Sequence, residues 1–294
     1  MIGIVLAGGT GSRLWPITTS VSKQMLPIYD KPMIHYPIST LMAAGIKNIV
    51  VVTTERDSNA FQGLLGDGHK LGVNFFYEVQ DAPRGIADAF NVCKNRIQGQ
   101  KVALILGDNL FHGQGLGRNL QKYLQVEGAQ IFGYQVSDPS QYGVAALDKD
   151  GNILQLVEKP ATPVSNIAIP GLYFYDETIL DVVANMKPSQ RNELEITDVN
   201  LSYLESGKLK IEVLPRGTAW LDTGTVDSLI EASNYMQIVE KRQGAKVACL
   251  EEVALNMGYI NLEGFDKCIT DFADTPYAKY LKDLRNQFLE REAT

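Results

Sequence analysis

Residues 1–27 constrain the fold of this chain more than any other stretch of it. The segment Ile2 to Leu6 is a short apolar run rich in β-branched residues, and Gly8-Gly9-Thr10-Gly11 ends it abruptly, as expected of a buried strand followed by a loop. Glycines let a backbone approach an anion closely and point consecutive N–H groups at it. Arg13 and Lys23 add two positive charges nearby. The pattern indicates a polyphosphate site at the end of the first strand of an α/β sheet.

Two better-known glycine loops are excluded by the residues that follow Gly11. A Walker A loop requires Gly-Lys-Ser/Thr at its end, whereas Gly11 is followed by Ser12-Arg13. The dinucleotide fingerprint requires a further glycine three residues on, where this chain has Leu14. An ordinary strand-to-helix turn is the alternative interpretation of the loop alone, and the nearby basic residues favour phosphate binding over it.

Length, charge and cysteine content restrict the class of protein. The 294 residues suffice for one large α/β domain or for a domain with an appendage. A net charge of −7 argues against a general nucleic-acid-binding protein, and the sequence has no apolar run of about 18 residues that would span a membrane. The cysteines at positions 93, 249 and 268 match no zinc or disulfide pattern. Since no signal peptide is evident, we expect a cytoplasmic protein.

Strand and helix patterns alternate after the glycine loop. Apolar runs predict strands over Asn48–Thr54, Val73–Val79 and Lys101–Leu106, and the segments between them predict helices over Met33–Ala44, Arg56–Leu65 and Gly85–Arg96. Such alternation is typical of a Rossmann-like, mixed but mainly parallel sheet flanked by helices. Ligands of these sheets bind at the carboxyl ends of the strands. We therefore expect the glycine loop and Gly107-Asp108-Asn109 to meet at one edge.

The pattern changes from Gln130 onward, where shorter runs predict a mixed-sheet extension that completes the pocket. A helix is predicted just before this point, over Leu116–Val126. After it, strands are predicted over Ile131–Val136, Gly143–Leu147, Ile153–Glu158, Ile167–Tyr175 and Lys208–Leu214, with helices over Glu177–Met186 and Ile196–Ser206. Long C-terminal helices are predicted over Thr225–Gln243 and Asp274–Glu290. We therefore divide the chain into a core with its extension, residues 1–225, and a helical segment, residues 226–294, that packs on the core or on another subunit.

Two acidic residues each follow an apolar segment. Asp108 comes after the strand that ends at Leu106, and Asp222 stands in Trp220-Leu221-Asp222-Thr223-Gly224, before a predicted helix. Mg²⁺ is bound by few carboxylates and completes its shell with water and phosphate oxygens. Both acids are therefore candidate metal ligands, although each is also placed to act only as a cap. Together with the glycine loop and the basic residues, they are the parts that metal-assisted phosphoryl or nucleotidyl transfer requires.

Other polar residues are placed to recognise a phosphate or a base. Lys159 follows Glu158 at the end of a predicted strand and is suited to act as a point charge, and Arg191 is suited to a bidentate phosphate contact. Gln80 offers a donor and an acceptor for the edge of a pyrimidine, and Gly85 lets a backbone N–H approach the base. For each of them an exposed loop position is the alternative interpretation.

The longest patterns together resemble the signature of the sugar-1-phosphate nucleotidylyltransferases. The first runs from Leu6 to Leu14, with Pro16, and a second continues from Lys23 to Met33. Six more follow along nearly the whole chain: Gly107-Asp108-Asn109, Tyr142-Gly143-Val144, Glu158-Lys159-Pro160, residues 171–176, residues 193–198 and residues 220–224. Ser12 stands where the signature usually has threonine, and Ile169 where valine is common. Both are mild departures.

The resemblance implies transfer of a thymidylyl group from dTTP to α-D-glucose 1-phosphate with Mg²⁺, giving pyrophosphate and dTDP-glucose for deoxysugar synthesis. It implies no covalent enzyme intermediate, and the sequence shows no evident nucleophile. The implied catalytic residues are Arg13, Lys23, Lys159 and Arg191. Nucleotide binding is implied for Leu6, Gly8, Gly9, Thr10, Gly11, Ser12, Gln24, Gln80, Gly85 and Asn109, sugar binding for Tyr142, Gly143, Glu158, Ile169 and Tyr173, and metal binding for Asp108 and Asp222.

Two other functions are compatible with the sequence. A related enzyme that uses UTP is one, because thymine and uracil differ by a methyl group worth only about 1–3 kcal/mol in a pocket. A non-catalytic sugar-nucleotide sensor on the same fold is the other, and the presence of Lys23, Asp108 and Asp222 favours an enzyme over it. Because the family commonly forms homotetramers and is inhibited by dTDP-rhamnose at a second site, the resemblance implies both properties here.

Overall fold

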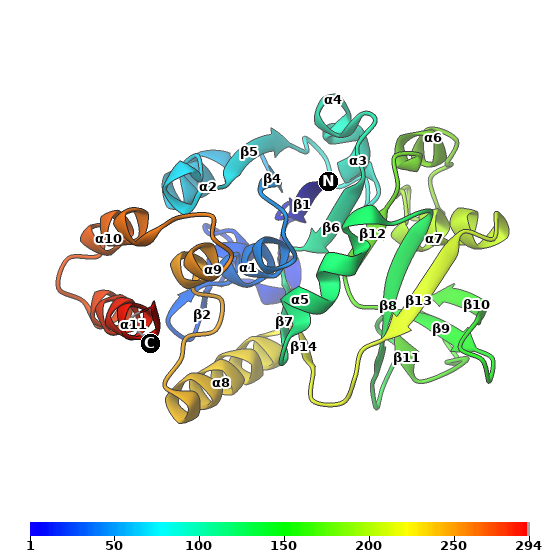
Figure 1. Cartoon of the computed structure of the whole chain (residues 1–294). Helices are drawn as coiled ribbons and strands as arrows, with labels where there is room; N and C mark the ends of the chain where they lie inside the picture. Colours follow the sequence, from blue (N-terminus) through cyan, green and yellow to red (C-terminus); the bar gives the residue numbers. More distant parts are fainter. Residues whose placement is uncertain (293–294) are drawn as a thin grey trace.

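A ten-stranded mixed sheet forms the centre of the molecule in a computed structural model, which describes residues 1–292 (Figure 1). Its strands are β1 (Ile2–Leu6), β4 (Asn48–Thr53), β5 (Asn74–Val79), β6 (Val102–Leu106), β8 (Ala129–Gln135), β9 (Gly143–Leu147), β10 (Ile153–Glu158), β11 (Ile167–Ala168), β12 (Leu172–Tyr175) and β13 (Leu209–Val213). The order is β10-β9-β11-β8-β12-β6-β1-β4-β5, and β13 pairs with β8. Residues 293 and 294, the last two of the predicted helical segment, lie outside the described residues.

The first half of the chain forms the parallel part of this sheet. Strand β1 lies between β4 and β6 and is parallel to both, with Val5 opposite Val51 on one side and Ile105 on the other. Strand β5 extends the parallel part. Strand β12 then pairs antiparallel with β6 and connects the parallel part to the extension. The predicted mixed sheet, with its parallel strands in the first half, is thereby confirmed.

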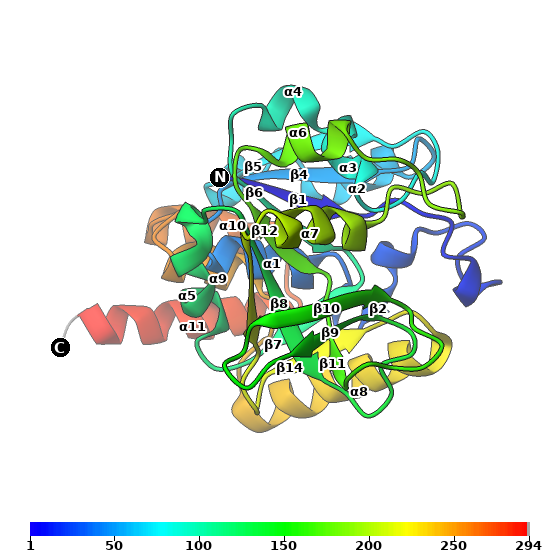
Figure 2. The same ribbon diagram turned by 90° about the vertical axis from the view of Figure 1, so that its right-hand side faces the viewer.

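Helices cover both faces of the sheet (Figure 2). They are α1 (His35–Ala43), α2 (Ser58–Leu65), α3 (Asp88–Val92), α4 (Lys94–Ile97), α5 (Leu116–Leu120), α6 (Ile179–Ala184), α7 (Ile196–Glu205), α8 (Val226–Gln243), α9 (Leu250–Asn256), α10 (Leu262–Thr270) and α11 (Pro276–Glu292). Short 3-10 turns span Ser12–Leu14, Lys23–Met25, His69–Leu71 and Gln121–Gln125. None of the helices in residues 1–292 is both long and apolar enough to cross a membrane.

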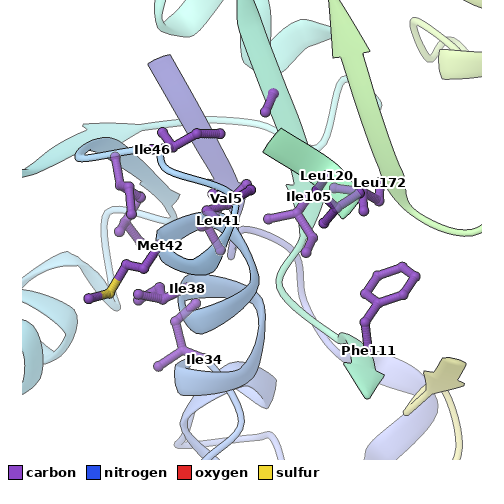
Figure 3. Packing of buried hydrophobic residues seen from close by; sticks show 14 of the residues in the cluster. Val5, Ile34, Ile38, Leu41, Met42, Ile46, Ile105, Phe111, Leu120 and Leu172 are labelled. Atoms are coloured by element: carbon purple, nitrogen blue, oxygen red, sulfur yellow. The ribbon is translucent and has the colours of Figure 1, made fainter. Parts of the chain in front are cut away.

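Successive side chains of β1 contribute to two different hydrophobic cores, one on each face of the sheet. Val5 belongs to the core that contains α1 and α9, and its neighbour Ile4 belongs to the core that contains α3, α6 and α7. Successive side chains of a strand point to opposite faces, so an unbroken apolar run is what a doubly covered strand requires. Figure 3 shows Leu41 of α1 beside Val5 in the first of these cores.

Several predicted elements are wrong in detail. The helix predicted over Gly85–Arg96 is two short helices that begin only at Asp88, because the backbone before it hydrogen-bonds with Leu194 instead. The strand predicted over Ile167–Tyr175 is interrupted at Pro170, which has no N–H to donate. Helices α9 and α10 were not individually predicted within the helical segment.

Two short two-stranded sheets complete the fold near the carboxyl edge of the main sheet. Strand β7 (Asn109–His112) pairs with β14 (Ala219–Asp222), which places Asp222 opposite Asn109. Strand β2 (Pro27–Ile28) pairs with β3 (Lys31–Pro32), and α8 packs against it. The first of these pairs brings together two acids that are distant in the sequence, and the sequence analysis did not predict it.

Candidate active site

The glycine loop leaves the carboxyl end of β1 and forms one wall of a cleft of about 200 Å³. Neighbouring strands fix its origin, since Ala7 N donates to Val52 O (2.7 Å) and Gly107 N donates to Leu6 O (2.9 Å). Gly11 has φ of 59°, a left-handed conformation that favours glycine, and its carbonyl accepts from Thr18 Oγ1 at 2.7 Å. The cleft is lined by residues 8–14, Lys23, Gln24, Asp108 and Gly224.

Lys23 and Asp108 form an ion pair on the floor of the cleft. The ammonium lies 2.5 Å from Asp108 Oδ2, and both side chains are largely buried. Burial alone would raise the pKa of Asp108, but Lys23 and the amide of Asn109 outweigh it, so that the pKa lies below its ordinary value. The cleft therefore contains a fixed positive charge and a fixed negative charge side by side.

Asn109 holds the surrounding backbone in place. Its Nδ2 donates to Asp108 Oδ1 (3.0 Å), while its Oδ1 accepts from Gly171 N (3.0 Å) and Trp220 Nε1 (2.7 Å). The residue is almost fully buried. It was predicted to bind nucleotide, and the structure places its amide between β6, β14 and the loop before β12.

Asp222 is the second acid of the site and arrives on β14. Thr223 anchors it there, because its backbone N and Oγ1 both donate to Asp108 O, at 3.2 and 3.0 Å. Burial first, and the charge of Asp108 second, raise the pKa of Asp222 to about 6. Two facing carboxylates that repel each other are a donor set that a divalent cation would stabilise.

The two carboxylates fit Mg²⁺ better than a metal that needs a full set of protein ligands. Among residues 1–292 no group of three or more His, Cys, Asp or Glu side chains is arranged to hold a metal. Mg²⁺ is commonly bound by one or two carboxylates together with substrate phosphates and water. Asp108 and Asp222 beside a phosphate-binding loop match that description.

A second cavity of about 170 Å³ adjoins the cleft and shares Arg13 and Asp108 with it. Of the predicted sugar-site and metal residues, it is lined by Tyr142, Gly143, Glu158, Ile169, Tyr173 and Asp222, together with Lys159. Thr197 Oγ1 donates to Glu158 Oε2 at 2.6 Å and fixes that carboxylate. A Cβ on Gly143 would lie 3.3 Å from the same oxygen, so the glycine leaves room beside it.

Lys159 and Arg191 both lie near the carboxylate of Glu158. Lys159 Nζ lies 3.9 Å from Glu158 Oε1, and Arg191 Nη2 lies 4.0 Å from the same atom. Arg191 also makes a bidentate contact with Glu195, at 3.1 and 2.9 Å. An arginine guanidinium binds a phosphate with the same bidentate geometry that Arg191 uses here to bind the Glu195 carboxylate. Arg191 is half exposed and does not line the cavity itself.

Gln80 lies beside Gly8 of the glycine loop, and Gly85 lies beside Gln80 and Leu194; neither residue lines either cavity. An ideal Cβ on Gly8 would lie 3.4 Å from Gln80 Oε1. Gly85 has φ of 99°, and a Cβ there would come within 2.4 Å of Leu194 O. Backbone hydrogen bonds from Leu194 N to Arg84 O (2.8 Å) and from Ala87 N to Leu194 O (3.1 Å) explain this close approach.

The sequence analysis missed several residues of the site. No binding role was predicted for Thr197, Asn200 or Trp220, yet all three line the second cavity. Trp220 packs its ring against Tyr142, with 4.9 Å between the ring centroids. The proximity of Trp220 to Asp222 in the sequence was the one available signal for its position.

Comparisons with known proteins identify the family of this chain. A family model described as nucleotidyl transferase matches residues 2–238. The chain is 51% identical over 284 residues to a glucose-1-phosphate thymidylyltransferase of Mycobacterium tuberculosis, covering 97% of this chain and 99% of that one. It is 49% identical over 283 residues to a protein of the same name from Xanthomonas campestris pv. campestris, covering 96% of each.

Two solved structures share the fold. One is a putative glucose-1-phosphate thymidylyltransferase from Bacillus anthracis in complex with a sucrose, with a TM-score of 0.74, 37% identity, and coverage of 80% of this chain and 95% of that one. The other is a UDP-glucose pyrophosphorylase complexed with UDP-glucose, with a TM-score of 0.71, 26% identity, and coverage of 81% and 98%.

Proposed function

This chain belongs to the nucleotidyl transferase family, and from that premise we propose that it is a glucose-1-phosphate thymidylyltransferase. It transfers a thymidylyl group from dTTP to α-D-glucose 1-phosphate and releases pyrophosphate. The observation that carries this proposal is the junction of the two cavities at Arg13 and Asp108. A triphosphate in the glycine-loop cleft and a sugar phosphate in the second cavity would meet end to end at that point.

The reaction is an in-line displacement. A phosphate oxygen of glucose 1-phosphate attacks the α-phosphorus of dTTP, a new P–O bond forms, and the bond to the bridging oxygen breaks with its electron pair leaving on pyrophosphate. The backbone of the glycine loop holds the triphosphate, Arg13 neutralises the leaving pyrophosphate, and Lys23 neutralises charge around the α-phosphate. Catalysis then rests on positioning and charge neutralisation.

Asp108 and Asp222 would hold Mg²⁺ at the junction of the cavities. The ion supplies charge neutralisation to the phosphate oxygens when bound. Thr223 keeps the backbone of the two acids together through its bonds to Asp108 O. Asn109 orients the first carboxylate from behind.

The second cavity binds glucose 1-phosphate. Lys159 and Arg191 hold its phosphate, and Glu158, oriented by Thr197, accepts hydrogen bonds from sugar hydroxyls. Gly143, Ile169, Tyr142 and Tyr173 shape the wall around the ring. Lys159 adopts φ of 43°, unusual for a residue with a side chain. A strained backbone of this kind is most often kept where function depends on it.

We also propose that the protein forms a homotetramer and is inhibited by dTDP-rhamnose, as the family resemblance implies. Helix α8 exposes Val226, Ile230 and Ile238 to solvent, and an exposed apolar row on a long helix is compatible with a subunit contact. Sedimentation of the pure protein measures the first property, and inhibition by added dTDP-rhamnose measures the second.

An enzyme that uses UTP is the second candidate, favoured by the fold shared with the UDP-glucose pyrophosphorylase. Pyrophosphate release from glucose 1-phosphate with dTTP, dUTP, UTP or dCTP separates the two candidates. We expect dTTP to give the highest kcat/KM, and a higher value with UTP would favour the alternative. A sugar-nucleotide sensor would release no pyrophosphate with any of them.

Two substitutions test the assigned roles. Asp108→Asn is expected to lower kcat/KM by at least about a hundredfold at limiting Mg²⁺, because it removes a carboxylate proposed to hold the ion. Lys159→Ala is expected to raise KM for glucose 1-phosphate by about tenfold, because it removes a positive charge that faces the sugar phosphate. Exposed Asp150→Asn and Lys149→Ala, outside both cavities, serve as controls. Near-full activity of Asp108→Asn would contradict the metal assignment, and an unchanged KM would contradict the role of Lys159.

A further inference from the structure

The side-chain amide of Gln80 is held in one orientation. Gln80 is 8% exposed, and its Nε2 donates to Asp88 Oδ2 at 3.0 Å and to Gly85 O at 3.3 Å. A carboxylate and a carbonyl can only accept hydrogen bonds, so the NH₂ group must be on that side. The amide carbonyl therefore faces away from Asp88, and it lies beside Gly8 of the cleft.

Asp88 is itself held in place. It is 4% exposed, and its Oδ2 accepts from Arg84 Nε at 3.1 Å, while its Oδ1 accepts from Asn91 Nδ2 at 3.4 Å. Arg84 is in turn fixed by Asp81, at 2.6 Å. Gln80, Arg84 and Asn91 all donate to the Asp88 carboxylate. The carboxylate therefore acts only as a hydrogen-bond acceptor, toward Gln80 as toward the other two residues.

The position of Gln80 Oε1 determines which base edge it recognises. Thymine and uracil carry a proton on N3 and donate it, whereas N3 of cytosine carries none and accepts. A fixed amide carbonyl can accept a hydrogen bond from N3–H of thymine or uracil. Toward cytosine the same carbonyl would face the lone pair of N3 and form no hydrogen bond with it. If the amide could turn over, its NH₂ group would suit cytosine instead.

We propose that Asp88 is the positioning residue that makes the nucleotide site selective for pyrimidines with an N3 proton, by holding the Gln80 carbonyl toward the base. The inference rests on the proposed function for the identity of the ligand, and it names a residue that does not contact substrate. It predicts discrimination of dTTP from dCTP and none between dTTP and dUTP at this position.

Asp88→Asn tests the proposal, because asparagine can present either a donor or an acceptor to Gln80. Binding of dTTP, dUTP and dCTP is measured by titration calorimetry with Mg²⁺ and without glucose 1-phosphate, so that turnover is not required. In the natural protein we expect dTTP to bind at least about tenfold more tightly than dCTP. In Asp88→Asn we expect this ratio to fall by about tenfold, with the ratio of dTTP to dUTP unchanged within about twofold.

Asp81→Asn is the matched control, because Asp81 also binds Arg84 but makes no hydrogen bond with Gln80. It should retain the natural selectivity. Gln80→Ala provides a second route should the first variant fold poorly: it should lose selectivity as well, and adding Asp88→Asn to it should change nothing further.

The outcomes separate the two proposals. The role of Asp88 is overturned if Asp88→Asn retains the natural selectivity, or if the effects of Asp88→Asn and Gln80→Ala are additive. It is also overturned if the natural protein binds dCTP as tightly as dTTP. If the natural protein binds dTTP selectively in this way but releases no pyrophosphate with glucose 1-phosphate, the proposed function fails while the role of Asp88 stands.

Discussion

His35 is an ionisable residue inside the protein that the proposed reaction does not use. It begins α1, and among residues 1–292 it is the histidine whose two ring nitrogens are both buried without a hydrogen-bond partner. Burial first, and the charge of Lys31 second, lower the pKa of His35 from 6.5 to about 4. The folded protein therefore favours the neutral ring.

Folding stability should consequently fall as the pH drops from 6.5 to 4. In this window the unfolded chain binds a proton at His35 and the folded chain does not, which costs up to about 3 kcal/mol at the acid end. In His35→Leu this part of the pH dependence should vanish, because no buried ring has to stay neutral. Urea unfolding at pH 7.5, 6 and 5 measures the difference.

The exposed His69 is the matched control for this prediction. His69→Gln should follow the natural protein across the same pH range. An identical pH dependence in His35→Leu and the natural protein would show that His35 does not titrate with a lowered pKa.

At the residue scale, site residues that directly follow a strand could be predicted from the sequence. Residues that hold those side chains in place by hydrogen bonds could not. The glycine loop and Asp108 were found because a buried strand ends just before each of them, and the residues around Gly8 and Asp108 do share a cleft. Asp88 in α3 and Thr197 in α7 were not predicted as supports, because tertiary packing and not local sequence pattern brings them to their partners, Gln80 and Glu158.

Helix α8 is fastened to the core by a buried ionic cluster near its C-terminal end. Glu240, 6% exposed, accepts from Lys31 Nζ at 2.8 Å and from Val247 N at 2.9 Å. Asp30 and Lys246 complete the cluster. The β2–β3 hairpin supplies Lys31 and the turn of that hairpin supplies Asp30, so the cluster connects the helix to the segment that follows the glycine loop.

Glu240→Gln is expected to destabilise the protein by about 3 kcal/mol, because it leaves buried Lys31 with less compensating charge. Glu231→Gln, the same change at an exposed position of the same helix, should stay within about 0.5 kcal/mol. The free energy of unfolding in urea measures both. Equal values for the two variants would mean that the cluster does not fasten α8.

At the element scale, prediction succeeded where local pattern and tertiary packing agree. The apolar runs of β1, β4 and β6 were identified within a residue or so, because a strand covered on both faces is apolar throughout. The short strands β7 and β14 were not predicted, because two four-residue strands that pair across a long stretch of sequence leave no local pattern.

Helix α9, in the C-terminal segment, shares a hydrophobic core with the first strand. Leu250 and Ala254 of α9 belong to the same buried cluster as Val5 of β1, and Tyr259 OH donates to Met42 O at 2.8 Å. The predicted boundary at residue 225 therefore does not coincide with a boundary between hydrophobic cores. We propose that residues 1–292 unfold as one unit.

Leu250→Ala tests this at the scale of the molecule. Leu250 is 3% exposed, and its truncation should cost about 2–5 kcal/mol. Because one buried cluster joins α9 to β1, tryptophan fluorescence and far-ultraviolet circular dichroism should report the same shifted transition. Leu154→Ala, at a position 68% exposed, is the control. Two separated transitions in Leu250→Ala would indicate an independent C-terminal unit.

The pairing of β7 with β14 also has a consequence for how the protein is made. Asp108 is synthesised 114 residues before Asp222, which is about 6–23 s at ordinary elongation rates of ~5–20 residues per second. During that interval Asp108 lacks the acid that faces it in the finished protein, and β7 lacks its neighbour. A nascent chain that stops before Asp222 therefore has half of the acid pair, so synthesis itself delays the assembly of the site until the sheet around the loop is complete.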